Sequence, residues 1–516
     1  MTSGGGRRAA ATVAVLALLV GACSAHGGGS SASPDRTTPS TGTSGGTGSS
    51  GGGSTTTGPG SGGGEPVAPL QWRTCGRFRC AELEVPVDHD APQGPTITLS
   101  MVKRPASKPD ERAGAILVNP GGPGGSAIDL AKQLPLPSRL TERFDVIGVD
   151  PRGVGQSSPL DCRSHLQAMY DADPTMEDDA DRAAYLDISQ QFVDECAETY
   201  ADLLPHLGTV DVAKDIDLVR RALGDDQITW LGYSYGTSIG QQYARLFPTR
   251  VRAMVIDGVV DTTQTGLEAA RDQAGGFDGA LDAFIADCDD QGCGLDRPAG
   301  EAVDDVLAAV ERAPIPNRRA DRPAGPGVAA LAVAQGVRAP ILWSQLARAL
   351  AQALDGNGDG LVKLADAYLG RQDDGTYPNG FEIYFAVGCL DQAWPADPDA
   401  IFEAAEAVGR DHPRVGESLV DDYVRCALWP TPPQPLEPIP SDIEGLAPIV
   451  VISTTGDPAT PYAAGVRVAD SIPGAVLVTN VGEGHTIFAQ GKRCIDDAVV
   501  DYLADLTLPP EGLRCS

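Results

Sequence analysis

The sequence has little positive charge. Its 516 residues include 39 Lys and Arg against 70 Asp and Glu, which gives a formal net charge of −31 at pH 7. Such an acidic surface repels phosphate backbones, so we exclude nucleic acid as a partner. The acidic excess either attracts cationic ligands or simply keeps the protein in solution.

The apolar run at the N-terminus is too short to span a bilayer well. The run AAATVAVLALLV follows Arg7 and Arg8 and ends at VGAC, residues 20–23. This pattern is typical of a signal peptide over residues 1–23. VGAC resembles a lipobox, which implies that Cys23 is lipidated and becomes the mature N-terminus. We therefore expect an exported protein, lipid-anchored to the outer face of the cell membrane; the alternative is a signal cut without lipidation, which gives a secreted protein.

Apolar side chains are almost absent from residues 24–65, which are rich in Gly, Ser and Thr. Such a segment cannot bury enough surface to offset the entropy lost on ordering. We predict a disordered tether that holds a folded domain away from the membrane.

The sequence contains no pair of cysteines with the C-x-x-C spacing of a zinc site, and His165 is the only histidine at ligand spacing from a cysteine. Both observations argue against a zinc site. The chain has eleven cysteines, and ten remain once Cys23 is set apart. An even number in an exported chain predicts disulfides. The sequence leaves the connectivity open, and pairing of sequence neighbours is the simplest arrangement: Cys75–Cys80, Cys162–Cys196, Cys288–Cys293, Cys389–Cys426 and Cys494–Cys515.

Strand-like and helix-like stretches alternate over residues 66–261 and again over residues 446–516. Helical stretches with Pro-rich connectors fill residues 262–445 between them. Alternation of this kind predicts an α/β fold, with a mostly parallel sheet and helices on both faces. The simplest organisation is one α/β domain interrupted by a helical block.

The stretch DGNGDGLVKLAD, residues 355–366, approaches a calcium-binding loop. Asp355, Asn357 and Asp359 would supply oxygen ligands, and Gly360 the sharp turn. Asp366 stands at the twelfth position, where a longer Glu usually gives bidentate ligation. The alternative is a polar turn between two helices.

GYSYGT, residues 232–237, has the form G-x-S-x-G and lies between the strand-like ITWL and a helix-like stretch. Strand, tight turn and helix are the context of a nucleophile elbow, which exposes the serine above the sheet edge at a helix N-terminus. The sequence therefore predicts that Ser234 is a nucleophile.

Histidine is scarce, which makes the search for a base short. Of six histidines, His485 follows the strand-like AVLVTNV in the turn GEGHT. Asp457 directly follows the strand-like PIVVIS and suits the carboxylate that orients the imidazole, whereas its rival Asp470 falls in a helical stretch. The order Ser234, Asp457, His485 is that of α/β-hydrolase triads, whose members lie at the carboxyl ends of strands.

An oxyanion needs backbone N–H donors as well. One is expected from Tyr235, next to the nucleophile, and one from a loop after an early strand. NPGGPGGS, residues 119–126, follows the apolar strand-like AILV, and its glycines allow close approach to substrate. We assign the second donor to Gly122.

Taken together, NPGGPGGSA, DPRGVGQS at 150–157, GYSYGT, DGVVD at 257–261, GDPATP and GHT resemble the tripeptidyl-aminopeptidase-like branch of the α/β-hydrolases. These are exported serine peptidases related to proline iminopeptidases, and the similarity runs from about residue 72 to 515. The resemblance implies the α/β-hydrolase fold, a helical cap over the site and release of short peptides from substrate N-termini. Pro120 stands where the related iminopeptidases have histidine. We expect neither cofactor nor metal.

A peptidase of this kind must recognise a free ammonium, which calls for a carboxylate in the cleft. Asp391 in VGCLDQAW is our candidate, and the alternative is an acid on a solvated face. Our first hypothesis is a serine aminopeptidase releasing di- or tripeptides from peptide or protein N-termini. The alternatives are an esterase or lipase with the same triad, and a non-catalytic surface binding protein on a hydrolase scaffold.

Overall fold

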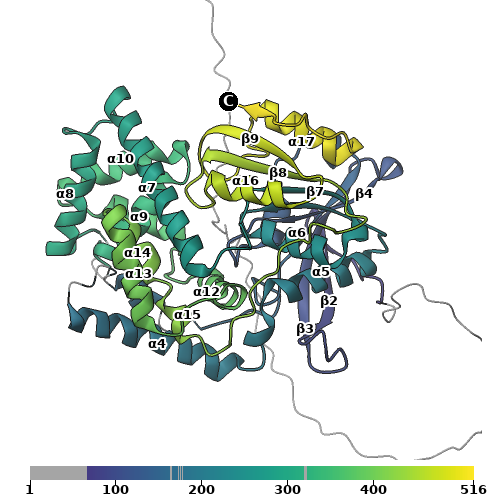
Figure 1. Cartoon of the computed structure of the whole chain (residues 1–516), viewed down its shortest axis with the longest axis horizontal. Coiled ribbons are helices and arrows are strands. Elements are labelled where there is room, and N and C mark those ends of the chain that lie inside the picture. The colour runs from purple at the N-terminus through teal and green to yellow at the C-terminus, as the bar shows by residue number, and fades with distance from the viewer. Residues whose placement is uncertain (1–66, 163–165, 173, 175, 177, 319–321) are drawn as a thin grey trace, which may run out of the picture.

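The computed structural model describes residues 67–516 except 163–165, 173, 175, 177 and 319–321 (Figure 1). The predicted signal peptide at 1–23, the lipidation site Cys23 and the tether at 24–65 lie outside the described residues. Within the described part of the chain, no helix is both long and apolar enough to cross a membrane.

The core of the structure is a ten-stranded sheet in the order β1-β2-β3-β5-β4-β6-β7-β8-β9-β10. Strands β1 to β3 and the β3–β5 pair are antiparallel, and the remaining neighbours are parallel. The strands are β1 (Arg73–Cys75), β2 (Phe78–Pro86), β3 (Thr96–Arg104), β4 (Gly114–Asn119), β5 (Phe144–Val149), β6 (Ile228–Tyr233), β7 (Val251–Asp257), β8 (Ile449–Gly456), β9 (Val476–Glu483) and β10 (Arg514–Cys515).

Helices connect the parallel strands and form the block between β7 and β8. They are α1 (Ala127–Gln133), α2 (Ser138–Thr141), α3 (Leu166–Asp171), α4 (Asp179–Tyr200), α5 (Thr209–Leu223), α6 (Tyr235–Leu246), α7 (Gly266–Gln291), α8 (Ala299–Arg312), α9 (Pro326–Val337), α10 (Pro340–Leu354), α11 (Asp359–Leu369), α12 (Gly380–Asp391), α13 (Pro398–Asp411), α14 (Gly416–Asp421), α15 (Val424–Leu428), α16 (Tyr462–Ser471) and α17 (Arg493–Asp505).

Alternate residues of the central strands face two separate apolar cores, as the two-residue period of a strand requires. In β6, Trp230 joins the core under α5 and α6, whereas Leu231 and Tyr233 join the core under α1 and α17. Helices therefore cover both faces of a mostly parallel sheet, and the predicted α/β-hydrolase architecture is confirmed.

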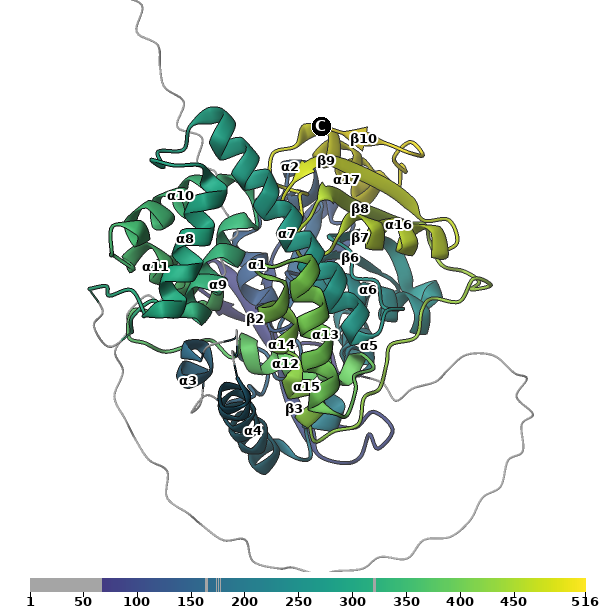
Figure 2. The ribbon, with the colours of Figure 1, turned by 60° about the vertical axis from the view of Figure 1, so that its left-hand side comes forward.

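The helical block between β7 and β8 lies beside the sheet in both views (Figures 1 and 2). Helices α7 to α11 share an apolar core of their own, while α12 packs Ile383 and Phe385 into the core of the sheet domain. Helix α4 lies within residues 66–261, the first part of the expected α/β domain. Its Tyr185 packs among Ile401, Phe402 and Val424 of the helical block. Further along α4, Phe192, Val193 and Cys196 lie in the core of the sheet domain, so this helix packs against both parts.

Five disulfides are present, and their partners are the sequence neighbours named above: Cys75–Cys80, Cys162–Cys196, Cys288–Cys293, Cys389–Cys426 and Cys494–Cys515. Because these bonds use all ten cysteines of the described part, none is left as a zinc ligand. Cys389–Cys426 joins α12 to α15 and so braces the block next to the sheet.

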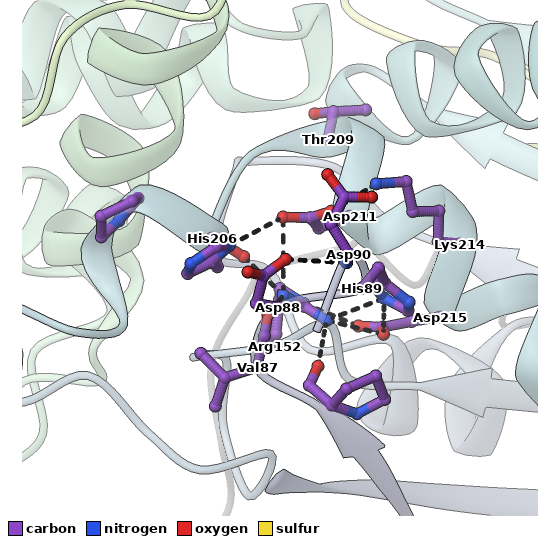
Figure 3. A network of polar contacts seen from close by, with 12 residues as sticks. Val87, Asp88, His89, Asp90, Arg152, His206, Thr209, Asp211, Lys214 and Asp215 are labelled. Atoms are coloured by element: carbon purple, nitrogen blue, oxygen red, sulfur yellow. Dashed lines mark hydrogen bonds and ion pairs between the residues drawn. The ribbon is translucent and has the colours of Figure 1, made fainter. Parts of the chain in front are cut away.

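A buried arginine ties the loop after β5 to its surroundings (Figure 3). The Arg152 side chain is fully buried and forms two bonds of 2.8 Å to the Asp215 carboxylate in α5. It also donates to the carbonyls of Pro86, Val87 and His206. One side chain thereby fixes the β2–β3 turn, the segment before α5, and α5 itself around the DPRG motif.

Arg152→Met is expected to lower the free energy of unfolding by about 3–5 kcal/mol, because it leaves the Asp215 carboxylate buried without its cation. Urea denaturation followed by tryptophan fluorescence measures the change. The control is Arg348→Gln, which alters an exposed arginine of α10 and should shift stability by less than about 0.5 kcal/mol. An Arg152→Met protein as stable as the wild type would contradict the anchoring role.

Candidate active site

Ser234 occupies the turn between β6 and α6 in a strained backbone conformation. Its φ is 53° and its ψ is −126°, a region that residues with a side chain rarely adopt. The turn is tight enough that a Cβ on Gly232 would lie 2.2 Å from the carbonyl oxygen of Gly236. The Ser234 N–H donates to the carbonyl of Asp257 at 2.9 Å, which ties the turn to the neighbouring strand. This is the geometry of a nucleophile elbow.

His485 and Asp457 meet at the carboxyl ends of β8 and β9. The His485 Nδ1 lies 2.8 and 2.9 Å from the two carboxylate oxygens of Asp457, and both side chains are buried. Thr460, which the sequence analysis did not single out, donates from its N–H and its hydroxyl to the same carboxylate. The rival Asp470 is exposed on α16.

The hydroxyl and the imidazole share one cavity. Ser234 and His485 both line it, and Nδ1 faces Asp457, so Nε2 is the ring nitrogen left for the hydroxyl. In the described part of the chain, these two side chains form no direct hydrogen bond within 3.5 Å. Catalytic hydrogen bonds are often long in substrate-free proteins and tighten when substrate binds.

Two backbone N–H groups are free to hold an oxyanion. The Gly121 N–H donates to the Asn119 side chain at 2.9 Å, whereas those of Gly122 and Tyr235 have no acceptor among the described residues. A Cβ on Gly121 would lie 2.7 Å from the Ser234 Cβ and 2.8 Å from the Tyr235 nitrogen, so only glycine lets the loop come this close. Both candidate donors line the cavity with Ser234.

Asp257 supports the histidine loop and was given no role in the sequence analysis. Its Oδ2 accepts the N–H groups of Ile487 at 2.9 Å and of Phe488 at 2.8 Å, two and three residues after His485. Burial raises the pKa of Asp257 to about 6, against the lowering effect of these two bonds. The sequence feature that could have indicated this role is the position of Asp257, at the end of an apolar strand-like run and at the start of the DGVVD motif.

The cavity has a volume of about 770 Å³ and lies between the strand ends and the helical block. Its wall on the block side carries aromatic residues of α12 and the turn before α15, which are Phe381, Tyr384, Phe385 and Tyr423. A cavity of this size, apolar with a few polar groups, suits a small organic or peptide ligand.

Asp391 also lines the cavity, at the last position of α12. It accepts the N–H of Thr209 at 3.0 Å and the Thr209 hydroxyl at 2.5 Å, so it caps α5. The Thr209 hydroxyl lies 2.8 Å from the hydroxyl of Tyr235. Burial raises the pKa of Asp391 to about 7, and no cationic side chain lies within 4 Å of it among the described residues.

Residues 355–358 of the calcium-loop pattern form the turn between α10 and α11, and residues 359–366 lie within α11. Asp359 begins α11, accepts the Arg318 N–H and pairs with the Arg318 guanidinium at 2.7 Å. Asp366 lies inside α11 and pairs with Arg322. Protein donors thus occupy these oxygens, and the described residues hold no group of three or more His, Cys, Asp or Glu arranged for a metal.

Comparisons with known proteins agree with this geometry. A family model described as alpha/beta hydrolase fold matches residues 114–297, and one described as TAP-like protein matches residues 412–515. Serine protease Hip1 of Mycobacterium tuberculosis is 38% identical over 476 residues, covering 87% of this chain and 91% of that protein. Carboxylesterase B of the same species is 37% identical over 486 residues, covering 89% and 93%. Tripeptidyl aminopeptidase of Streptomyces lividans is 29% identical over 479 residues, covering 87% of each chain.

Asp257→Ala should lower kcat by about 10- to 100-fold, because the two freed N–H groups loosen the loop that carries His485. Asp257→Asn keeps a carbonyl oxygen for both donors and should stay within about tenfold of the wild type. Turnover of a p-nitrophenyl ester measures both variants, with thermal unfolding as the check on folding. Equal rates for the folded alanine variant and the wild type would contradict the supporting role of Asp257.

Proposed function

The chain belongs to the α/β-hydrolase superfamily, in its tripeptidyl-aminopeptidase-like branch, and from that premise we propose that it is a serine aminopeptidase. The proposed reaction is the release of di- or tripeptides from the N-termini of peptides or proteins. The observation that carries it is the arrangement of Ser234, His485 and the N–H groups of Gly122 and Tyr235 around one cavity. The same cavity contains Asp391, a buried carboxylate with no cationic side chain within 4 Å among the described residues.

In the proposed mechanism, the Ser234 hydroxyl attacks the scissile carbonyl while Nε2 of His485 takes its proton. Asp457 holds the imidazole through Nδ1 and stabilises the imidazolium. The N–H groups of Gly122 and Tyr235 hold the oxyanion. The imidazolium then gives its proton to the leaving amine, and water hydrolyses the acyl-enzyme in a second cycle of the same steps. These steps require no cofactor.

Asp391 is the proposed site for the substrate ammonium. Its bonds from Thr209 are both from uncharged donors, so they leave its negative charge without a cation. Burying an unpaired carboxylate is unfavourable, and a bound ammonium would offset that cost. This contact would distinguish a free N-terminus from a blocked one.

An esterase is the second candidate function, favoured by the relative named carboxylesterase B. Esters are easier acyl donors than amides, so the same triad would cleave them. A non-catalytic binding protein on the same scaffold is a third reading, and the Asp457–His485 bond beside a cavity shared with Ser234 argues against it.

We also propose that the protein is exported and held to the membrane by a lipid at Cys23. Five disulfides support an oxidising compartment, since such bonds are rare in reducing cytosol. Globomycin treatment of expressing cells would test the anchor, because it blocks cleavage of lipoprotein signals.

Hydrolysis of tripeptidyl anilides with free or acetylated N-termini separates the candidate functions. We expect the free-amine substrate to have a kcat/KM at least tenfold higher, because only it provides the ammonium for Asp391. Ser234→Ala should lower kcat by about 10⁴-fold or more. Turnover that ignores the free amine would favour an esterase, and unchanged turnover by Ser234→Ala would rule out the mechanism.

The rate should depend on pH through Asp391. A carboxylate binds ammonium only when it is ionised, and the pKa of Asp391 is raised to about 7 by burial. As the pH falls below about 7, kcat/KM for a free-amine peptide should therefore fall more steeply than kcat/KM for its acetylated counterpart. Asp391→Asn should make the two profiles parallel, and parallel profiles in the wild type would contradict the assignment.

A further inference from the structure

Most charged side chains that line the cavity are neutralised by a neighbour of opposite charge. Asp129 pairs with Lys132, Asp261 and Asp272 pair with Arg467, and Asp422 pairs with Arg425. Two arginines line the cavity, Arg338 and Arg425. Of these, Arg338 has no carboxylate within 4 Å anywhere in the described part of the chain. An arginine without a carboxylate partner, in a cavity whose other charges are mostly paired, is a candidate anion site.

Arg338 stands at the corner between α9 and α10, against the catalytic loop. Its carbonyl oxygen accepts the backbone N–H of His485 at 3.0 Å. Its guanidinium carbon lies 5.7 Å from the centre of the Tyr368 ring, and Tyr368 lines the cavity as well. The ring holds the guanidinium against the cavity wall by a cation–π contact and leaves its N–H donors without a carboxylate.

The proposed mechanism defines two sides of the reacting bond, and Arg338 can be compared with Asp391 on that basis. The tetrahedral carbon on Ser234 directs its oxyanion to Gly122 and Tyr235, and its leaving nitrogen to His485, which protonates that nitrogen. The backbone carbonyl of Arg338 accepts the N–H of His485, and both residues line the same cavity, so we infer that Arg338 faces the leaving-group side. Asp391, in contrast, accepts the Thr209 hydroxyl, which lies 2.8 Å from the phenol hydroxyl of Tyr235, the residue after the nucleophile.

We propose that Arg338 binds a carboxylate on the leaving-group side of the scissile bond. That carboxylate is either the C-terminus of a short peptide or an acidic side chain close to the cleaved bond. The inference rests on the proposed peptidase function and names its substrate class, which is oligopeptides with a free N-terminus and a negative charge shortly after the cleavage point. A planar guanidinium suits such a group because it donates two parallel hydrogen bonds.

The test compares peptides that differ only in that charge. The first pair is tetra-alanine with a free C-terminal carboxylate and tetra-alanine amide. The second pair carries Asp or Asn as the fourth residue of an otherwise identical peptide amide. For the wild type we expect kcat/KM at least about tenfold higher for the charged member of one pair or both, and the pair that responds identifies the source of the carboxylate.

Substitutions then assign the preference to one side chain. Arg338→Gln should bring the ratio between charged and uncharged peptides to about one, and Arg338→Lys, which keeps the charge without the fork, should retain part of it. Arg348→Gln changes an exposed arginine on the same helical block, outside the cavity lining, and should keep the wild-type ratio. If the Arg338→Gln variant fails to fold, the kcat/KM ratios of the wild type and of Arg338→Lys still test whether Arg338 binds the carboxylate.

The outcomes separate this inference from the function on which it rests. No turnover of any free-amine peptide overturns the proposed function and this inference together. Equal kcat/KM within both wild-type pairs overturns the role of Arg338 alone. A wild-type preference that persists in a folded Arg338→Gln protein also overturns it, because another group must then bind the carboxylate.

Discussion

The close approach of two backbone segments, the glycine loop after β4 and the strained turn at Ser234, is the constraint on which the site depends. A side chain at Gly121 would collide with the carbonyl oxygen of Tyr233 at 2.5 Å and with Ser234 itself. The Asn119 side chain accepts the Gly121 N–H, whereas the next N–H, that of Gly122, has no acceptor in the part of the chain that the structure describes. The N–H groups of Gly122 and Tyr235 and the Ser234 hydroxyl therefore line one cavity, at a turn whose φ of 53° is itself strained.

Buried carboxylates at the strand ends hold the loops that carry this arrangement. Asp150, after β5, accepts the Ser126 hydroxyl and the Ile128 N–H and so fixes the far end of the glycine loop. Asp257 does the same for the histidine loop, and Asp457 orients the imidazole. Asn379 adds a link from the helical block, since its amide donates to the carbonyl of Gly153. Hydrogen bonds from several separate elements thus hold in place the loops that surround the strained turn at Ser234.

Much of this organisation could be predicted because the informative residues follow apolar strands. Ser234, Asp457 and His485 each follow an apolar strand-like run. In a parallel sheet, such residues lie at the same edge, independently of the conformation of the loops. The contacts of Thr460, Asp257 and Arg338 could not be predicted, since they arise where distant segments fold over that edge. The contacts of helix α4 with α13 and α15 could not be predicted either, because those two helices come much later in the chain. Asp366 matched a ligand position by spacing alone, yet it pairs with Arg322, an interaction the loop pattern does not include.

The central claim is that the strained turn makes Ser234 a nucleophile that His485 activates. Treatment of the folded protein with a fluorophosphonate, followed by peptide mapping by mass spectrometry, tests it most directly. The account predicts a single adduct on Ser234, formed at least about 10³-fold more slowly in a folded His485→Ala variant. An adduct on another residue, or no adduct on a folded wild-type protein, would contradict it.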